Sequence, residues 1–256
     1  SRSAMNNFFV HYRPLPPGLK RFVLLTLTVI TAIIVVLGFW GPSLHNQYGP
    51  GRRQPVRELS GWLLDGPGGA QLAVPQPGQT NQGTSFNRVL LAGPGKTIPP
   101  PAVMDHVGEW VKVRGSLFSR GALDVMNTRK ATPTRPPSGT PEADASGSSE
   151  GEFTLRGEIM DSKCFSGVMK PGSGKTHMGC AIRCISGGVP AVFHVRRNSG
   201  ATLDFVLIDD QNRTVNERVL PLVAQPLELK GEVIRFDNLL ALRANPETYR
   251  SLEQSN

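Results

Sequence analysis

The longest apolar segment lies near the N-terminus, where residues 22–40 contain no charged side chain. A helix of this length spans close to 30 Å at about 1.5 Å per residue, which matches the hydrocarbon core of a bilayer. The pattern therefore predicts a transmembrane helix at residues 22–41. Lys20 and Arg21 precede the segment, and the next basic residue after it is Arg52. By the positive-inside rule, the N-terminus is then cytoplasmic and the rest of the chain lies outside.

This apolar segment has two other interpretations. A cleaved signal peptide would need a small-x-small cleavage site, whereas residues 41–44 read Gly-Pro-Ser-Leu. A buried core helix is the second alternative, but a helix that is apolar on all faces is rarely used in that way. An uncleaved anchor is the prediction that best fits the pattern.

After residue 56 the pattern changes to short segments of alternating apolar and polar residues, which are typical of β-strands. Residues 110–118 alternate in this way, and residues 226–235 repeat the pattern with Gly115 and Gly231 at corresponding positions. Mid-strand glycines suit the sharp bends of a small, strongly coiled barrel. The sequence thus predicts a mainly β protein with one N-terminal transmembrane helix followed by two small OB-like β-barrel domains, although plain five-stranded sheets or a sandwich are alternatives.

The predicted organisation has six parts. They are a cytoplasmic N-terminal segment (1–21), a transmembrane helix (22–41), a spacer (42–56), a first OB-like domain (57–130), a linker rich in Pro, Ser and Gly (131–151) and a second OB-like domain (152–256). The second domain carries a short Cys/His helix inserted after its first strand. The first domain has only the Gly/Pro-rich stretch 66–84 at that place.

The net charge of +8 is concentrated near the predicted membrane segment. Residues 1–57 contain seven basic and no acidic residues, whereas the rest of the chain has 21 basic and 20 acidic residues. This distribution indicates anionic lipid head groups as the partner, and no stripe of basic and aromatic residues supports nucleic-acid binding. The Gly-rich stretches 172–176 and 95–97 lack the first glycine of a phosphate-binding loop, so no nucleotide is expected.

All three cysteines and one histidine lie in the segment 157–190. A helix capped by Thr176 would place His177, Cys180 and Cys184 on one face, and Cys164 would return to them across a loop. These four residues, Cys164, His177, Cys180 and Cys184, form a complete tetrahedral ligand set for Zn²⁺. Zn²⁺ matches the set best, and Cu(I) or an iron–sulfur centre are alternatives because thiolates are soft ligands.

A disulfide is the competing interpretation of the same cysteines. Outside the cytoplasm, Cys164 could bridge to Cys180 or Cys184, which would leave one free thiol and no role for His177. An enzymatic activity is not predicted. The sequence contains no Ser-His-Asp signature and no nucleotide fingerprint, and four protein ligands would fill a tetrahedral metal site.

The Cys/His segment resembles a family of poorly characterised, exported, membrane-anchored bacterial proteins. The resemblance rests on three motifs: G-E-I-M-D-S-K-C at 157–164, H-M-G-C-A-I-R-C at 177–184 and G-G-V-P at 187–190. It covers about 35 residues and implies an association with membrane-bound redox systems. One membrane helix followed by an OB barrel is also similar in outline to the periplasmic haem chaperone of cytochrome c maturation, but the His-x-x-x-Tyr attachment site of that family is missing here.

Together these features predict a single-pass protein of the bacterial inner membrane with its C-terminal domains in the periplasm. The expected role is an accessory or structural subunit of a respiratory or photosynthetic electron-transfer complex. The expected partners are the lipid bilayer and a larger membrane protein complex, with no nucleic acid and no nucleotide. A periplasmic metal or haem delivery chaperone and a small electron carrier with a Cys/His-ligated metal centre are the alternative functions.

Overall fold

The computed structural model describes residues 16–46, 51–76, 86–143, 146–197 and 199–252. The chain divides into two compact units, one formed by residues 1–48 and the other by residues 49–256.

The described residues of the first unit form one long helix, α1 (Pro17–Asn46), which is longer than predicted at both ends. The Lys20 amide donates to the Pro16 carbonyl, so the helix begins before the charged pair, and Pro42 lies inside it. The hydroxyl groups of Thr26 and Thr28 donate to carbonyls one turn back, so both groups are hydrogen-bonded within the helix.

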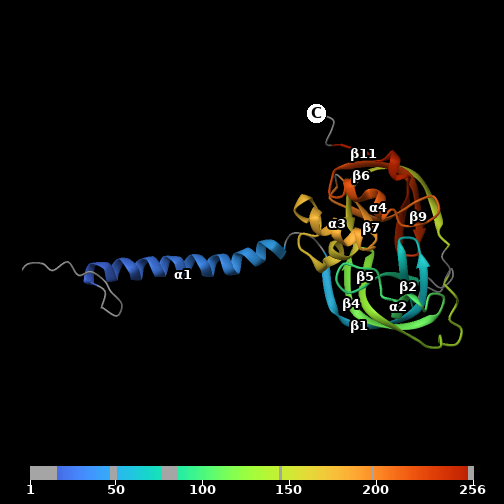
Figure 1. Ribbon diagram of the computed structural model, residues 1–256, viewed down its shortest axis with the longest axis horizontal. Coiled ribbons are helices and arrows are strands. Elements are labelled where there is room, and N and C mark those ends of the chain that lie inside the picture. Colours follow the sequence, from blue (N-terminus) through green and yellow to red (C-terminus); the bar gives the residue numbers. More distant parts are fainter. Residues whose placement is uncertain (1–15, 47–50, 77–85, 144–145, 198, 253–256) are drawn as a thin grey trace, which may run out of the picture. The chain divides into compact units, whose positions relative to one another are not determined.

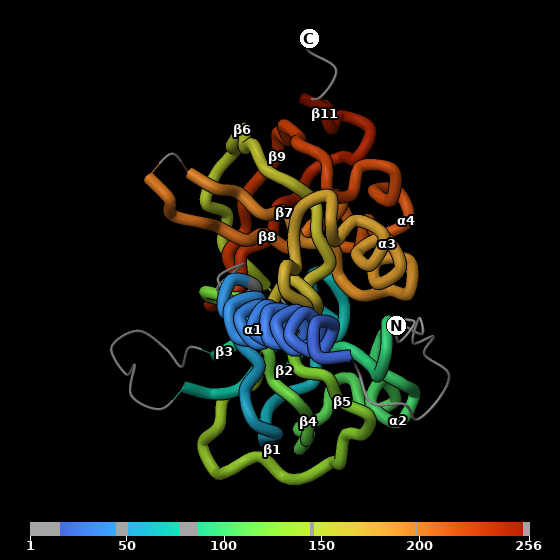
Figure 2. Tube along the Cα trace, turned by 90° about the vertical axis from the view of Figure 1, so that its left-hand side faces the viewer, coloured from blue at the N-terminus to red at the C-terminus, as the bar shows by residue number. Residues whose placement is uncertain are grey.

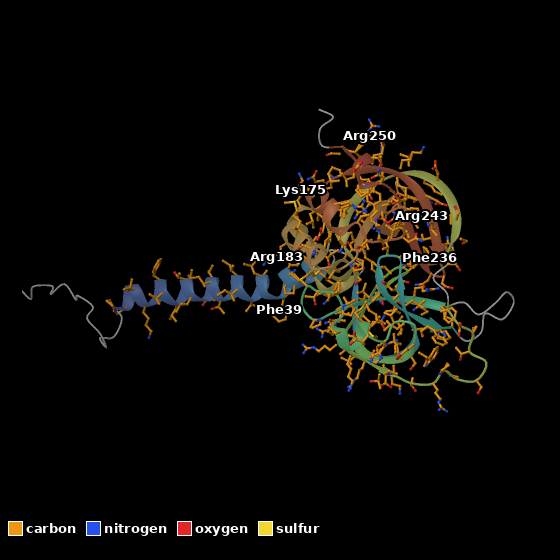
Figure 3. All side chains as sticks on the ribbon, turned by 45° about the vertical axis from the view of Figure 1, so that its right-hand side comes forward. Phe39, Lys175, Arg183, Phe236, Arg243 and Arg250 are labelled. Carbon is orange, nitrogen blue, oxygen red and sulfur yellow. The ribbon has the colours of Figure 1, made fainter. Side chains whose placement is uncertain are left out.

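Most side chains of residues 17–44 are exposed, as Phe39 illustrates in Figure 3. Residues 17–44 have a mean hydropathy of 2.8 in their most apolar window, and none of this window is buried. The helix is therefore long and apolar enough to cross a membrane.

Two five-stranded β-barrels form the second unit (Figure 1). The strands of the first barrel are β1 (Arg52–Gly66), β2 (Gly69–Pro75), β3 (Phe86–Ala92), β4 (Trp110–Arg120) and β5 (Leu123–Pro133). They close in the order β1-β2-β3-β5-β4, with β3 and β5 parallel and the other pairs antiparallel. A short helix, α2 (Pro101–Met104), connects β3 to β4.

The second barrel repeats this arrangement. Its strands are β6 (Ser148–Asp161), β7 (Ala191–Arg196), β8 (Thr202–Ile208), β9 (Leu227–Phe236) and β10 (Leu239–Arg243). The order β6-β7-β8-β10-β9 closes through β6 and β9, again with one parallel pair, β8 and β10. The two-residue strand β11 (Arg250–Ser251) adds to β9. The predicted pair of OB-like barrels is thereby confirmed.

Corresponding glycines mark the same bend in both barrels. A Cβ atom on Gly115 in β4 would lie 2.2 Å from the Asn127 carbonyl oxygen, and one on Gly231 in β9 would lie 2.4 Å from the Arg243 carbonyl oxygen. Only a residue without a side chain permits such a close approach of the neighbouring strand. The matched glycines therefore let a neighbouring strand approach closely at corresponding places in both barrels.

Several element bounds differ from the predicted ones. The strand β1 begins at Arg52, inside the predicted spacer, because it continues to pair with β4 up to Ser119. The strand β2 occupies much of the stretch 66–84 that was expected to be a loop, and Leu72 in it is fully buried. Residues 77–85 lie outside the described residues. The strands β5 and β6 also extend into both ends of the predicted linker 131–151.

The two barrels share part of their hydrophobic core. Leu90 and Val125 of the first barrel belong to the same buried cluster as Phe193 and Val206 of the second. Arg88, which is 2% exposed, donates through Nε to Asp237 at 2.7 Å across the boundary. The barrels therefore form one compact unit despite the polar segment that joins them in sequence.

The predicted insertion lies between β6 and β7. It consists of a π-helical turn, η1 (Cys164–Val168), a 3₁₀ turn, η2 (Lys175–His177), and the helix α3 (Met178–Ser186). Further short helices are α4 (Asn216–Val219), η3 (Leu220–Leu222) and η4 (Pro246–Thr248). Figure 2 shows α3 and α4 at the side of the second barrel, where α3 contacts β6 and α4.

Candidate metal site

The site begins where β6 ends. Asp161 is the last residue of that strand, and its Oδ1 accepts a hydrogen bond of 2.7 Å from the backbone amide of Cys164. This contact turns the chain into η1 and fixes Cys164 beside the strand end. The loop then returns through η2 to α3, where Cys180 and Cys184 lie one helical turn apart and face Cys164.

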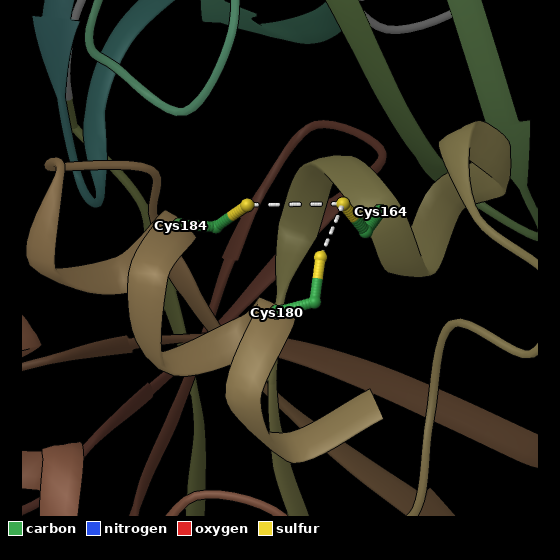
Figure 4. Close-up of side chains that lie close together, drawn as sticks. All are labelled: Cys164, Cys180 and Cys184. Atoms are coloured by element: carbon green, nitrogen blue, oxygen red, sulfur yellow. Dashed lines mark hydrogen bonds between the residues drawn. The ribbon is translucent and has the colours of Figure 1, made fainter. Parts of the chain in front are cut away.

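The three cysteine sulfurs converge on one point (Figure 4). The Sγ atom of Cys164 lies 3.8 Å from that of Cys180 and 3.7 Å from that of Cys184. All three cysteines are free thiols. Two thiolates on a tetrahedral zinc ion, with Zn–S bonds of about 2.3 Å, would lie about 3.8 Å apart. The observed separations thus fit three sulfur ligands around one metal ion.

The cysteines lie in a small hydrophobic cluster with Val189. Cys164 and Cys184 are buried, whereas Cys180 is partly exposed. The Cys164 thiol interacts with the Cys184 sulfur, and this contact raises the pKa of Cys164 and lowers the pKa of Cys184. Of these two thiols, Cys184 therefore loses its proton more readily than Cys164.

A lysine from the first barrel reaches this cluster. The Nζ atom of Lys96 lies 2.7 Å from the Cys180 sulfur and 3.5 Å from the Cys184 sulfur, and it also donates to the Cys180 carbonyl at 3.4 Å. Burial lowers the pKa of Lys96, but the hydrogen bond to Cys180 and the negative charge of both sulfurs outweigh burial and raise it. Lys96 thus places a positive charge directly against the sulfur atoms of Cys180 and Cys184.

A second lysine holds the turn that carries Lys96. Lys163 is 4% exposed, and its Nζ donates to the carbonyl oxygens of Gly93 at 2.6 Å and Gly95 at 2.8 Å. Burial lowers the pKa of Lys163. On the other side of the turn, the Ile98 amide donates to the Gly187 carbonyl at 3.2 Å, at the end of α3. The turn of residues 93–98 is therefore fixed on both sides of the cysteine site.

His177 takes a different position from the one predicted. The helix α3 begins at Met178 without a side-chain cap, so the prediction that Thr176 caps it is wrong, and His177 ends the 3₁₀ turn before it. His177 is 3% exposed, and its Nε2 lies 3.0 Å from Oδ2 of Asp161. A ring nitrogen of His177 lies within 4.8 Å of potential ligand atoms of Asp161 and Cys164. The Cys164 sulfur also belongs to a second set, which it forms with the sulfurs of the other two cysteines.

The four predicted ligands therefore do not form one set. The three cysteines form one possible metal-binding group, and His177 belongs to another with Asp161 and Cys164. Asp161 bonds both the Cys164 amide and the His177 ring. A carboxylate that bonds a histidine ring is the usual outer partner of a metal-binding histidine, because it fixes the orientation of the ring. Cys164, Cys180 and Cys184 could hold a metal ion, and His177 lies at the edge of that set.

A further histidine, His194, is buried in β7. Its Nδ1 lies 2.7 Å from Oδ1 of Asp204, and its ring packs against Phe165 with 4.8 Å between the ring centroids. Within the described part of the chain, neither His194 nor Asp204 belongs to a group able to bind a metal. The pair is a buried contact of the second barrel.

Sequence reasoning missed both lysines of this site. Lys96 was noticed only in a glycine-rich turn that fails as a phosphate-binding loop, and Lys163 was not considered. Lys163 directly precedes Cys164, and a lysine next to a metal-ligating cysteine was the one signal available. The contacts themselves join residues about 70 to 90 positions apart, which the spacing of motifs does not reveal.

The comparisons with known proteins add little to this picture. No protein-family model matches the chain, and no curated protein matches it. Among solved structures, the chain is similar to a deletion mutant of the single-stranded DNA binding protein from Thermus aquaticus, with 14% sequence identity and a TM-score of 0.22. The match covers 78% of this chain and 94% of that one. At this TM-score the similarity carries no argument about function.

Proposed function

We propose that this protein is anchored in the bacterial inner membrane by α1 and holds a metal ion at Cys164, Cys180 and Cys184. The observation that carries the proposal is the convergence of the three sulfurs at separations of 3.7 and 3.8 Å. Lys20 and Arg21 at the start of the helix favour a cytoplasmic N-terminus and a periplasmic body.

Zn²⁺ fits the donor set best. Three thiolates and one Zn²⁺ sum to a charge of −1, and the Lys96 ammonium group brings the total to zero. In such a site the metal fixes η1 and α3 to each other and contributes its binding energy to the fold. Cu(I) is the second metal that suits a set of thiolates.

The proposed role is that of an accessory subunit of a membrane redox complex. The support comes from the membrane-spanning length of α1 and from the resemblance of the motifs at 157–190 to proteins associated with such systems. A specific observation favours delivery of a metal as the second candidate function. Cys180 is partly exposed, and three sulfur ligands leave one position of a tetrahedral metal open to an exchanging ligand.

The proposal is tested on the full chain extracted gently from its membrane, by metal analysis combined with thiol counting. One metal per chain and three thiols that react only after chelation are expected. The variants C164S, C180S and C184S should each lose the metal. The variant H106A should keep it, because His106 is bonded to Glu109 in the first barrel. An intact chain without metal, or with a disulfide at Cys164, would overturn the site.

The two roles differ in the effect that metal removal has on the fold. A structural metal in a subunit should stay bound under mild chelation, and its removal should unfold the second barrel. A delivered metal should leave without unfolding and should pass to an acceptor. The subunit role further requires that the full chain co-purifies with a partner that carries a redox cofactor, detected by its visible absorption.

A further inference from the structure

A basic groove crosses the outer surface of the first barrel. It has a volume of about 460 Å³ and is lined by residues of β1, β4 and β5. Four of its residues are exposed and basic: Lys112, Arg114, Arg129 and Lys130. Glu58 is the one acidic residue in the lining, and it pairs with Lys112 at 3.0 Å.

The positive charge extends beyond the groove along β1. Arg52, Arg53 and Arg57 are exposed on that strand, and Arg57 pairs in register with Gly115 of the groove. Within the described residues, Arg114, Arg129 and Lys130 have no ion-pair partner. The first barrel, residues 52–133, has ten basic and five acidic residues, whereas the second, residues 148–251, has thirteen and twelve.

The sequence limits how far this surface can lie from the proposed membrane anchor. Six residue steps separate Asn46, where α1 ends, from Arg52, where β1 begins. A fully extended chain of that length spans at most about 20 Å. The length of the chain therefore sets an upper limit of about 20 Å on the distance between the end of α1 and the start of β1.

We infer that the basic groove and the exposed arginines of β1 bind the anionic head groups of the membrane that α1 spans. The attraction of basic residues to anionic lipids acts within a Debye length, about 8–10 Å at ordinary salt. The short connection allows the surface to come within that reach, and the attraction between opposite charges then favours the contact. The body is then held against the bilayer by its first barrel, in addition to its anchorage by α1.

Lysine acetylation of the full chain in vesicles tests this inference without any substitution. Lys112 and Lys130 are the reporters, and Lys230, which is exposed on the second barrel, is the internal control. In vesicles with one third anionic phosphatidylglycerol, acetylation of both reporters should be slower by about fivefold than in neutral phosphatidylcholine vesicles. About 0.5 M salt should abolish the difference, since it shortens the Debye length. Lys230 should react equally in all cases.

Charge reversal provides the matched variants. The double variant R114E/R129E should lose the protection of Lys112 and Lys130 in anionic vesicles. The double variant R197E/R250E, on exposed residues of the second barrel, should keep it. Equal acetylation in anionic and neutral vesicles would overturn the inference. Protection found only in native membranes would also overturn it, and would indicate a protein partner for the groove.

Discussion

The ammonium group of Lys96 lies 2.7 Å from the sulfur of Cys180, although the two residues belong to different barrels. The insertion of the second barrel supplies all three sulfurs, and the first barrel supplies the positive charge against them. The candidate site is thus a property of both barrels together. Lys163 of the second barrel likewise connects the two barrels, because it donates hydrogen bonds to the carbonyl oxygens of Gly93 and Gly95 in the first.

Replacing Lys96 by methionine should make the bound metal easier to remove. The ammonium group neutralises part of the thiolate charge and covers the most exposed sulfur, so its loss should speed metal transfer to a chelator several-fold. With Cd²⁺ as the probe metal, the sulfur-to-metal absorption band should move to longer wavelength, because a thiolate without its hydrogen bond is a better electron donor. Lys96→Arg should restore part of both effects.

Lys230→Met is the control for this experiment, since Lys230 is exposed on the second barrel and pairs with Glu152, away from the cysteines. A transfer rate and a Cd²⁺ band that do not change in Lys96→Met would show that the lysine has no influence on the metal. A change in unfolding temperature without a shift of the band would assign Lys96 to packing alone.

Asp161→Asn should weaken metal binding by about 10- to 100-fold, the usual cost of removing an outer partner of a metal site. The asparagine keeps an oxygen for the Cys164 amide but loses the negative charge that holds the His177 ring. Competition titration with a chromophoric chelator measures the change. Asp204→Asn, which disturbs the His194 pair instead, should leave the affinity unaltered; a loss in both variants would contradict a specific role for Asp161.

Gly231→Ala should destabilise the body by about 1–3 kcal/mol, the typical cost of forcing extra atoms into a packed region. The added Cβ would meet the Arg243 carbonyl oxygen at 2.4 Å and push β9 and β10 apart. Chemical denaturation gives the free energy of unfolding. Gly179→Ala should have no such cost, because nothing lies within 4 Å of that position in α3 and alanine favours helices.

Asp209→Asn should remove a part of the acid sensitivity of the second barrel. Burial raises the pKa of Asp209, but hydrogen bonds from Arg213 and Gln211 outweigh it and lower that pKa. A carboxyl whose folded-state pKa is lowered stabilises the fold above about pH 4, and this stabilisation is lost as the pH falls through the folded-state value.

The free energy of unfolding of the wild type should therefore decline between about pH 4 and pH 2 more steeply than that of Asp209→Asn. At neutral pH the variant should be less stable by about 1–3 kcal/mol, since it loses bonds to Arg213 and Arg218. Asp210→Asn, at the exposed neighbouring position, is the control and should follow the wild-type curve.

The repeated strand pattern was sufficient to predict both barrels, because alternating residues and matched glycines follow directly from the geometry of a coiled sheet. The strand β2 was missed because Gly69 and Pro75 at its ends read as loop residues, while its buried centre is short. The cysteines of the site could be predicted from soft-ligand chemistry. The position of His177 could not, since it depends on where α3 begins and on the buried charge of Asp161.

The duplicated barrels have a consequence for how the thiols are protected. If Lys96 came from a separate molecule, its contact with Cys180 would depend on protein concentration and would be lost on dilution. Within one polypeptide the lysine is present at a fixed one-to-one ratio and at a high effective concentration. Each chain therefore supplies the lysine that contacts its own cysteines, and this contact does not depend on a second copy of the protein.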